Sequence, residues 1–272
     1  MFKHAITRQP GANYQDGLTT VDLGVPDLEK TLLEHSGYLT ALKTCGLAVL
    51  ELEPDLRFPD GTFVEDTAIL LSDPQGTCPQ GTCSSPNGGA AILTRPGAQS
   101  RLDEVSEMKD TLLAFFPEVA QISAPGTLDG GDICEAGSHF FIGISLRTNQ
   151  AGAQQLAAWL VARGYSASFI DIRQVAGILH LKSGISYIGD NRLVVIDSLA
   201  GHPDFKGYEL IRVVPGEEYA ANCIRVNDYV LIAAGFPKFE ATLRKLGYKL
   251  LVLDMSEFQK MDGGLSCLSL RF

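Results

Sequence analysis

Hydrophobic and polar positions follow two periods along this chain. Apolar residues recur every three or four positions in four segments, which predicts amphipathic helices over 27–45, 102–116, 150–163 and 239–247. Five short apolar runs follow these helices or a weaker helical segment. They predict strands over 47–52, 119–122, 167–170, 208–214 and 249–253.

Further strands are expected in pairs between these units, at 65–71 with 90–94, 132–134 with 139–144, 185–188 with 192–196, and 222–226 with 229–233. Beyond the first unit, the strands that follow helices recur about every 40–50 residues, which favours a propeller-like array over a doubly wound sheet. A ring of five units needs its last strands beside its first. We therefore expect a C-terminal strand carrying Cys267 to close the ring, with a mixed α/β sandwich as the alternative fold.

Composition adds limits on the class of protein. The 272 residues, 45% of them apolar, are sufficient for a large core in a soluble protein of one or two domains. The chain turns polar at its start and contains no run of ~18 apolar residues, so we expect a cytoplasmic protein that does not bind a membrane. The net charge of −10, without any run of basic residues, argues against nucleic acid as a partner. This acidity suits a cationic ligand or simply maintains solubility.

The cysteines fall into three groups. Cys45, Cys134 and Cys223 lie in apolar patterns and are most simply core residues. Cys78 and Cys83 lie in a Gly/Pro/Ser-rich loop, where they would form a disulfide or half of a zinc site, although no second Cys/His pair has metal-ligand spacing. The sixth cysteine, near the C-terminus, requires a separate interpretation.

Cys267 follows a glycine pair in the run 262–272. With His180 and a carboxylate in the segment 126–132, it forms a candidate Cys/His/carboxylate set for nucleophilic catalysis. The alternative is a small buried cysteine without reactivity. Glycine pairs at 130–131 and 263–264 favour catalysis, because glycine permits unusual backbone conformations and lets a substrate approach closely.

Carboxylates gather at a turn and at the start of an otherwise apolar strand. Asp60, Glu65 and Asp66 lie within seven positions, flanked by Phe58 and Phe63. A planar guanidinium donates five hydrogens in a fork that carboxylates match. The pattern therefore indicates a cation pocket, with a solvated turn as the alternative.

Arg95 and Arg147 each come at the end of an apolar strand, where side chains of sheet proteins often meet ligands. Both are suited to a substrate carboxylate, although a single arginine in such a place is usually a surface cation. A ligand that is cationic at one end and a carboxylate at the other would satisfy both clusters. Arginine-like amino acids have this form.

A family resemblance extends over the whole chain. It is carried by the segments 16–19, 57–60, 63–66, 95–97, 128–132, 147–149, 179–182, 220–223 and 262–272. With these segments the chain resembles the dimethylarginine dimethylaminohydrolases of the guanidine-modifying (pentein) superfamily. The resemblance implies a five-bladed α/β propeller, with pseudo-fivefold ββαβ-type units around a central active site and residues 1–272 as a single catalytic domain.

The resemblance also implies a role for each candidate catalytic residue. Cys267 would be the nucleophile, His180 the general acid and base, and Asp129 the carboxylate that orients the imidazole. The implied reaction hydrolyses N-omega-methylated arginines to citrulline and the methylamine through a covalent thiouronium intermediate. It uses no metal or organic cofactor, and zinc would act only as an inhibitor that caps the Cys267 thiolate.

The implied substrate-binding residues are Leu18, Asp60, Glu65, Asp66, Arg95, Arg147 and Met261. Asp60 and Asp66 would hold the guanidinium nitrogens, with Glu65 supporting the pocket. The two arginines would hold the substrate carboxylate. Leu18 would belong to a lid, and the Met261 carbonyl would receive the α-amine. The implied partner is this small molecule alone, and a homodimer is compatible with the resemblance.

Four other functions fit parts of the pattern. Arginine deiminase shares the chemistry but usually carries an extra helical domain, for which this chain has no length. Agmatine has no carboxylate for Arg95 and Arg147, which argues against agmatine deiminase. The ribosome-binding factor of the same superfamily is disfavoured by the retained Cys267, His180 and Asp129. A cysteine protease is disfavoured because its local signatures are absent from the sequence.

Overall fold

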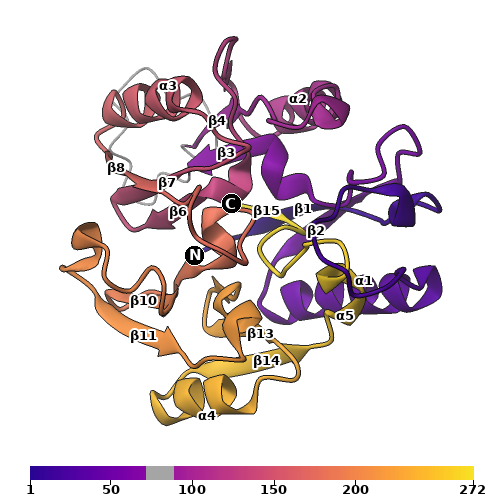
Figure 1. Cartoon of the computed structure of the whole chain (residues 1–272). Helices are drawn as coiled ribbons and strands as arrows, with labels where there is room; N and C mark the ends of the chain where they lie inside the picture. The colour runs from indigo at the N-terminus through magenta and orange to yellow at the C-terminus, as the bar shows by residue number, and fades with distance from the viewer. Residues whose placement is uncertain (72–88) are drawn as a thin grey trace.

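Five three-stranded sheets form a ring in the computed structural model, which describes residues 1–71 and 89–272 (Figure 1). In each sheet the inner strand is antiparallel to the middle strand, and the outer strand is parallel to it. A parallel return requires a crossover connection, which explains why a helix usually separates the middle and outer strands. The predicted five-bladed α/β propeller is confirmed.

The first unit contains β1 (His4–Arg8), α1 (Leu28–Thr44), β2 (Ala48–Leu52) and β15 (Leu270–Arg271). The second contains β3 (Ala68–Leu71), β4 (Ala90–Leu93), α2 (Glu104–Leu113) and β5 (Val119–Gln121). The third contains β6 (Ile133–Ala136), β7 (His139–Ile144), α3 (Gln150–Val161) and β8 (Ser166–Asp171). The fourth contains β9 (Ile185–Tyr187), β10 (Arg192–Ile196) and β11 (Glu209–Val213). The fifth contains β12 (Ile224–Val226), β13 (Tyr229–Ala233), α4 (Pro237–Lys245) and β14 (Lys249–Leu253).

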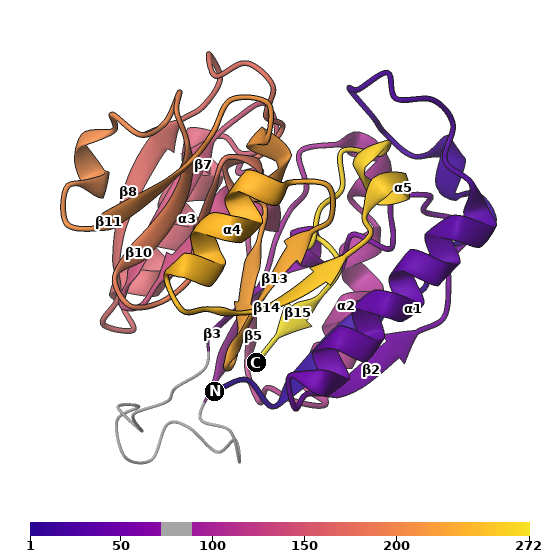
Figure 2. The ribbon, with the colours of Figure 1, turned by 90° about the horizontal axis from the view of Figure 1, so that it is seen from below.

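The two ends of the chain close the ring in a shared sheet. β15 pairs antiparallel with β1 in the register Ala5 with Arg271 and Ile6 with Leu270. The N–H groups of Lys3 and His4 both donate to the Phe272 carbonyl at 2.8 Å, so the termini lie side by side (Figures 1 and 2). The expected closing strand is therefore present. Cys267 lies in the turn before it, so the prediction that the strand itself carries Cys267 is wrong.

Three other details differ from the sequence predictions. The strand expected from residue 65 begins at Ala68, because Glu65 and Asp66 both face inward from a 3-10 helix, whereas consecutive strand residues point to opposite faces. The strand β1 was not predicted, because four of its five positions are buried, including Thr7 and Arg8, so it shows no alternation. In the fourth unit a 3-10 helix at Pro203–Phe205 replaces the weaker helix.

The inner strands line the axis of the ring. β15 contacts β3, β6 contacts β9, and β9 contacts β12, while α1 to α4 lie on the outside (Figure 1). A short 3-10 helix or turn leads into each inner strand: Val64–Thr67, Gly130–Asp132, Leu181–Ser183, Glu218–Ala221 and the turn containing Cys267. Because the units repeat, these five entry segments converge on the axis. The loop between β1 and α1 lies at the end of the molecule opposite the termini (Figure 2).

Cys45, Cys134 and Cys223 are buried free thiols, as expected of core cysteines. The expectations for Cys78 and Cys83 fall on residues outside those that the structure describes. Among the described residues, no helix has both the length and the apolar character needed to cross a bilayer.

Candidate active site

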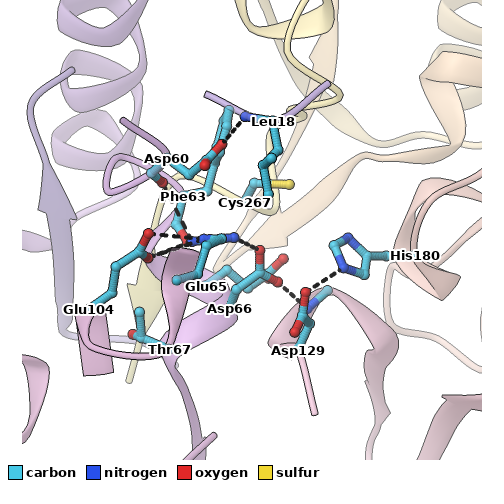
Figure 3. A network of polar contacts seen from close by, with 12 residues as sticks. Leu18, Asp60, Phe63, Glu65, Asp66, Thr67, Glu104, Asp129, His180 and Cys267 are labelled. Carbon is cyan, nitrogen blue, oxygen red and sulfur yellow. Dashed lines mark hydrogen bonds and ion pairs between the residues drawn. The ribbon is translucent and has the colours of Figure 1, made fainter. Parts of the chain in front are cut away.

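Cys267 is held in the turn between α5 (Ser256–Gln259) and β15. Its N–H donates to the Gly264 carbonyl, and its own carbonyl accepts from the Glu65 N–H, both at 3.1 Å. The thiol is free and half-buried. In Figure 3 its sulfur points toward the side of the site on which the His180 ring lies. The turn therefore presents the thiol beside the carboxylate-rich segment before β3.

The glycine pair before Cys267 makes room for neighbouring side chains. A Cβ at Gly263 would overlap the Phe63 ring, and one at Gly264 would lie 2.6 Å from the Asn222 amide. Asn222 in turn accepts a hydrogen bond from the Ser266 N–H at 2.9 Å. These two glycines therefore allow close packing between protein groups, and the approach of a substrate to them stays a prediction.

The second glycine pair serves the same purpose around His180. A Cβ at Gly130 would overlap the Glu65 carbonyl, and one at Gly131 would lie 2.8 Å from the His180 ring. Among the described residues, the glycines with positive φ include none of these four. The pairs are therefore explained by crowding at the axis and not by unusual backbone conformations.

Asp129 and His180 are in contact, as the family resemblance implied. His180 Nε2 and Asp129 Oδ2 are 3.0 Å apart, and Asp129 is fully buried. The other carboxylate oxygen accepts from the Gly97 N–H at 2.7 Å. This second contact fixes the carboxylate plane, so Asp129 can orient the imidazole (Figure 3).

Asp132 is a buried carboxylate to which the sequence prediction gave no role. It accepts from the Leu181 N–H at 3.0 Å and from the Ser145 hydroxyl at 2.6 Å. Burial raises its pKa to about 6. Its bond to the residue that follows His180 positions the histidine loop. The Gly-Gly-Asp sequence before β6 was the available signal, because an acid in an apolar setting needs a partner.

The carboxylates of Asp60 and Asp66 lie at the same end of the axis. Asp60 accepts from the Leu18 N–H at 3.0 Å, which joins the loop before α1 to the site (Figure 3). Asp66 accepts from the Gly131 N–H at 2.8 Å and from Arg101 Nη1 at 2.6 Å. Burial acts to raise the pKa of Asp66, but the charges of His180 and Arg101 outweigh it and lower the pKa to about 2. Asp66 is therefore an anion at neutral pH.

Glu65 points toward the interior of the ring. One oxygen lies 2.5 Å from Lys182 Nζ, and the other accepts from the Ser266 hydroxyl at 2.8 Å. A cavity of about 170 Å³, lined in part by Glu65, Lys182, Ser266 and Arg271, lies on this side. Glu65 thus lies between the cavity and the turn that contains Cys267, and its supporting role in the pocket stays a prediction.

The remaining expected residues surround this group. Within the described part of the chain, neither Arg95 nor Arg147 has a carboxylate within ion-pair distance. Burial raises the pKa of Asp60, and the charge of Arg147 is among the effects that oppose this rise. Met261 is buried, and its side chain lies near Gly17, next to the half-exposed Leu18. Two cations are thus available to an anionic ligand group near the carboxylates.

The protonation states of the thiol and the imidazole are set by these neighbours. Burial, followed by the charges of Glu65 and Asp66, raises the pKa of the Cys267 thiol to about 12. Burial alone would lower the pKa of His180, but the charge of Asp66 and the hydrogen bond that His180 donates to Asp129 outweigh it and raise the pKa to about 9. At neutral pH the free protein therefore carries a neutral thiol and an imidazolium.

Ligand atoms of Asp66, Asp129 and His180 lie within 4.8 Å of one another, the spacing of a metal site. Arg101 and Gly131 already donate to Asp66, and a metal would have to displace the His180 proton. Cys267 is not in this group of three. Zinc at Cys267 therefore stays a prediction.

Comparisons with known proteins show the family of this chain. No family model matches the chain. It is 42% identical to the N(G),N(G)-dimethylarginine dimethylaminohydrolase of Pseudomonas aeruginosa, with 100% of both chains covered. It is 31% identical to the Streptomyces coelicolor enzyme of the same name, over 99% of this chain and 96% of that one. A solved structure of a mutant of the Pseudomonas aeruginosa enzyme with citrulline superposes with a TM-score of 0.90, at 41% identity and full coverage of both chains. The chain belongs to the dimethylarginine dimethylaminohydrolase family.

Proposed function

We propose that this chain hydrolyses asymmetric dimethylarginine and monomethylarginine to citrulline and the methylamine. The observation that carries the proposal is the convergence of Cys267, the Asp129-bound His180 and the Asp66 anion on one end of the axis. Membership of the family and the citrulline complex of its Pseudomonas aeruginosa member support the same reaction. We also propose a cytoplasmic enzyme that acts on this small molecule, as a homodimer.

The ends of the substrate would be bound by opposite charges. Asp60 and Asp66 hold the guanidinium nitrogens, because charge-assisted hydrogen bonds to carboxylates suit a planar fork. Arg95 and Arg147 hold the substrate carboxylate. The Met261 carbonyl receives the α-amine, and Leu18 covers the site as part of the loop that Asp60 contacts.

Substrate binding would activate the nucleophile. The guanidinium adds a positive charge beside Glu65 and Asp66, the two anions that raise the Cys267 pKa, and therefore favours loss of the thiol proton to water. The thiolate then attacks the guanidinium carbon. The fixed carboxylates and the imidazolium are already oriented, so little reorganisation accompanies the attack.

His180 would serve in both halves of the reaction. As an imidazolium it donates its proton to the departing dimethylamine, which leaves a thiouronium bound to Cys267. The neutral imidazole then takes a proton from water, whose oxygen attacks the same carbon. Collapse of that adduct releases citrulline and the Cys267 sulfur. No step in this sequence uses a metal, and we propose that zinc inhibits by binding the thiolate.

Citrulline release from a panel of substrates tests the proposal. Asymmetric dimethylarginine, monomethylarginine, arginine and agmatine are compared at equal enzyme concentration. We expect the two methylated substrates to have the highest kcat/KM and agmatine, which has no carboxylate for the two arginines, to have the lowest. A preference for arginine would indicate a compact deiminase instead, and release from none of them would refute an enzymatic role.

The pH dependence of kcat should report His180. Its raised pKa means that the imidazolium is present below about pH 9 and is lost as the pH rises through that value. Because kcat describes the substrate complex, where a bound cation disfavours the imidazolium, its basic limb should lie at or below about pH 9. The Asp129→Asn variant should move this limb to lower pH. A limb at the same pH in both proteins would contradict the role of His180 as the acid.

A further inference from the structure

Arg101 is a buried arginine that the proposed reaction does not use. It ends the 3-10 helix Gln99–Arg101 just before α2, and only 4% of its surface is exposed. Its Nε and Nη2 donate to the Glu104 carboxylate at 3.0 and 2.8 Å. Its Nη1 donates to Asp66 Oδ2 at 2.6 Å. The guanidinium therefore lies between two buried carboxylates, one on α2 and one at the axis.

The same guanidinium also holds the backbone that precedes Asp66. Nη2 donates to the Phe63 carbonyl at 3.1 Å and lies 3.4 Å from the Asp60 carbonyl. One rigid plane thus fixes both ends of the segment 60–66, which contains three of the proposed substrate-binding residues. In Figure 3, Glu104 and Asp66 lie on the two sides of this hydrogen-bond network.

The orientation of the Asp66 carboxylate depends on two donors alone among the described residues. The Gly131 N–H binds Oδ1 and Arg101 binds Oδ2. Gly131 packs against the His180 ring, so the first donor belongs to the catalytic side of the site. The second donor, Arg101, sets the rotation of the carboxylate about that bond. A change at Arg101 would therefore alter the orientation of the carboxylate that binds the substrate guanidinium in the proposed function.

A lysine would not reproduce this arrangement. The ammonium is a compact point charge, whereas guanidinium presents donors in a planar fork that can bind two carboxylates and a carbonyl together. Its charge also matters, because Asp66 and Glu104 would otherwise be unpaired anions in the interior. Charge and fork geometry can thus be separated by experiment.

We propose that Arg101 is a positioning residue, which orients the Asp66 carboxylate toward the substrate guanidinium without contacting the substrate itself. This inference rests on the proposed function, because it assigns Asp66 to guanidinium binding. Glu104 is the anchor that holds the Arg101 fork in place. The three side chains form a Glu104–Arg101–Asp66 series that runs from α2 to the axis.

The first test is the Arg101→Lys variant, assayed by citrulline release from asymmetric dimethylarginine. We expect KM to rise about tenfold or more while kcat changes by less than about threefold, because Asp66 binds the cation in the ground and transition states alike. Alkylation of Cys267 by iodoacetamide, which does not use Asp66 for binding, should proceed at the wild-type rate. An unchanged KM in a folded variant would overturn the proposal.

A double-mutant cycle with Asp66→Asn tests whether Arg101 acts through Asp66. If it does, Arg101→Lys should change KM by less than about twofold once Asp66→Asn is present, because the two effects are not additive. Equal effects of Arg101→Lys in both backgrounds would show an independent role and refute the proposal.

Arg8→Lys is the matched control. Arg8 is also a buried arginine, and its guanidinium binds Glu107 of α2 and the Glu53 carbonyl. Within the described residues the bond from Arg8 to segment 60–66 is made by its backbone, because the Arg8 carbonyl accepts from the Thr62 hydroxyl at 2.9 Å, and the Lys substitution leaves that carbonyl in place. The Arg8→Lys variant also loses a planar guanidinium that contacts α2, and it should keep the wild-type KM. A KM that rises as much as in Arg101→Lys would make the effect a general loss of packing against α2, contrary to the proposal.

The Glu104→Gln variant covers the case in which Arg101→Lys does not fold. It retains the size of the side chain and the Arg101 charge but weakens the anchor of the fork. We expect a KM increase of about threefold or more, absent in the Asp66→Asn background; a normal KM in the folded variant would refute the positioning role. The wild-type assay separates the two levels of failure, because only a wild type without activity refutes the proposed function itself.

Discussion

Replacement of Cys267 with alanine is expected to abolish the release of citrulline from dimethylarginine. Without the sulfur no thiouronium can form. Oriented carboxylates and an imidazolium would remain, but they would only bind the substrate. We therefore expect a loss of at least about 10⁴-fold in kcat, the scale seen when a covalent catalyst loses its nucleophile.

The fold should tolerate this change. Cys267 is half-buried, its two backbone hydrogen bonds do not involve the thiol, and its sulfur lies 3.9 Å from Ser266 Oγ. The stability change should be within about 1 kcal/mol, so the melting temperature serves as a check. The Cys45→Ala variant, which removes a buried thiol at the end of α1, should keep its turnover. Normal turnover by Cys267→Ala would remove the nucleophile from the mechanism.

The repeated units of the fold were predictable because they depend on local patterns. The helix–strand units recur in the sequence, and their bounds in the structure differ from the predictions by a few residues. The structure differs from the elements predicted by the hydrophobic pattern where tertiary contacts determine the backbone conformation. β1 is buried at Thr7 and Arg8, and the segment before β3 turns two successive acids inward. No alternation in the sequence reveals either choice.

The catalytic group was predictable for a different reason. Cys267, His180 and Asp129 are distant in sequence, and each precedes an inner strand of a different unit. A fivefold repeat brings such equivalent positions to one axis, so the expected ring already implied their proximity. Asp129 contacts His180 at 3.0 Å, as the family resemblance indicated.

Arg101 and Asp132 were missed because their importance comes from burial. In the sequence Arg101 is one of many cations beside polar residues, and nothing marks it as enclosed. In the structure it is buried together with Asp66 and Glu104, and burial reduces the solvent screening of the attraction between these charges. Asp132 likewise acts through Leu181, a contact between the neighbouring third and fourth units. Such roles require the three-dimensional arrangement.

Replacement of His180 with glutamine should have the second largest effect. The amide can still donate to Asp129, but it cannot protonate a departing amine or accept a proton from water. Loss of general acid–base catalysis costs about 10²–10⁴-fold, and we expect kcat for dimethylarginine to fall in that range. His180 has two proposed roles, protonation of the leaving amine and activation of the hydrolytic water. A substrate whose leaving group needs no proton should separate them.

S-methyl-L-thiocitrulline provides that separation. Its leaving group, methanethiolate, needs no proton, so Cys267 of the His180→Gln variant should still displace it. The resulting thiouronium would then persist, because no imidazole activates the hydrolytic water. We expect the His180→Gln variant to release about one equivalent of methanethiol per enzyme and to gain mass on Cys267. The mass increase should be absent from the double variant that also carries Cys267→Ala. Rapid turnover of this substrate by the variant would show that another group activates water. Failure to form the adduct would instead place His180 in the attack step, because the thiolate then depends on the imidazolium charge that glutamine lacks.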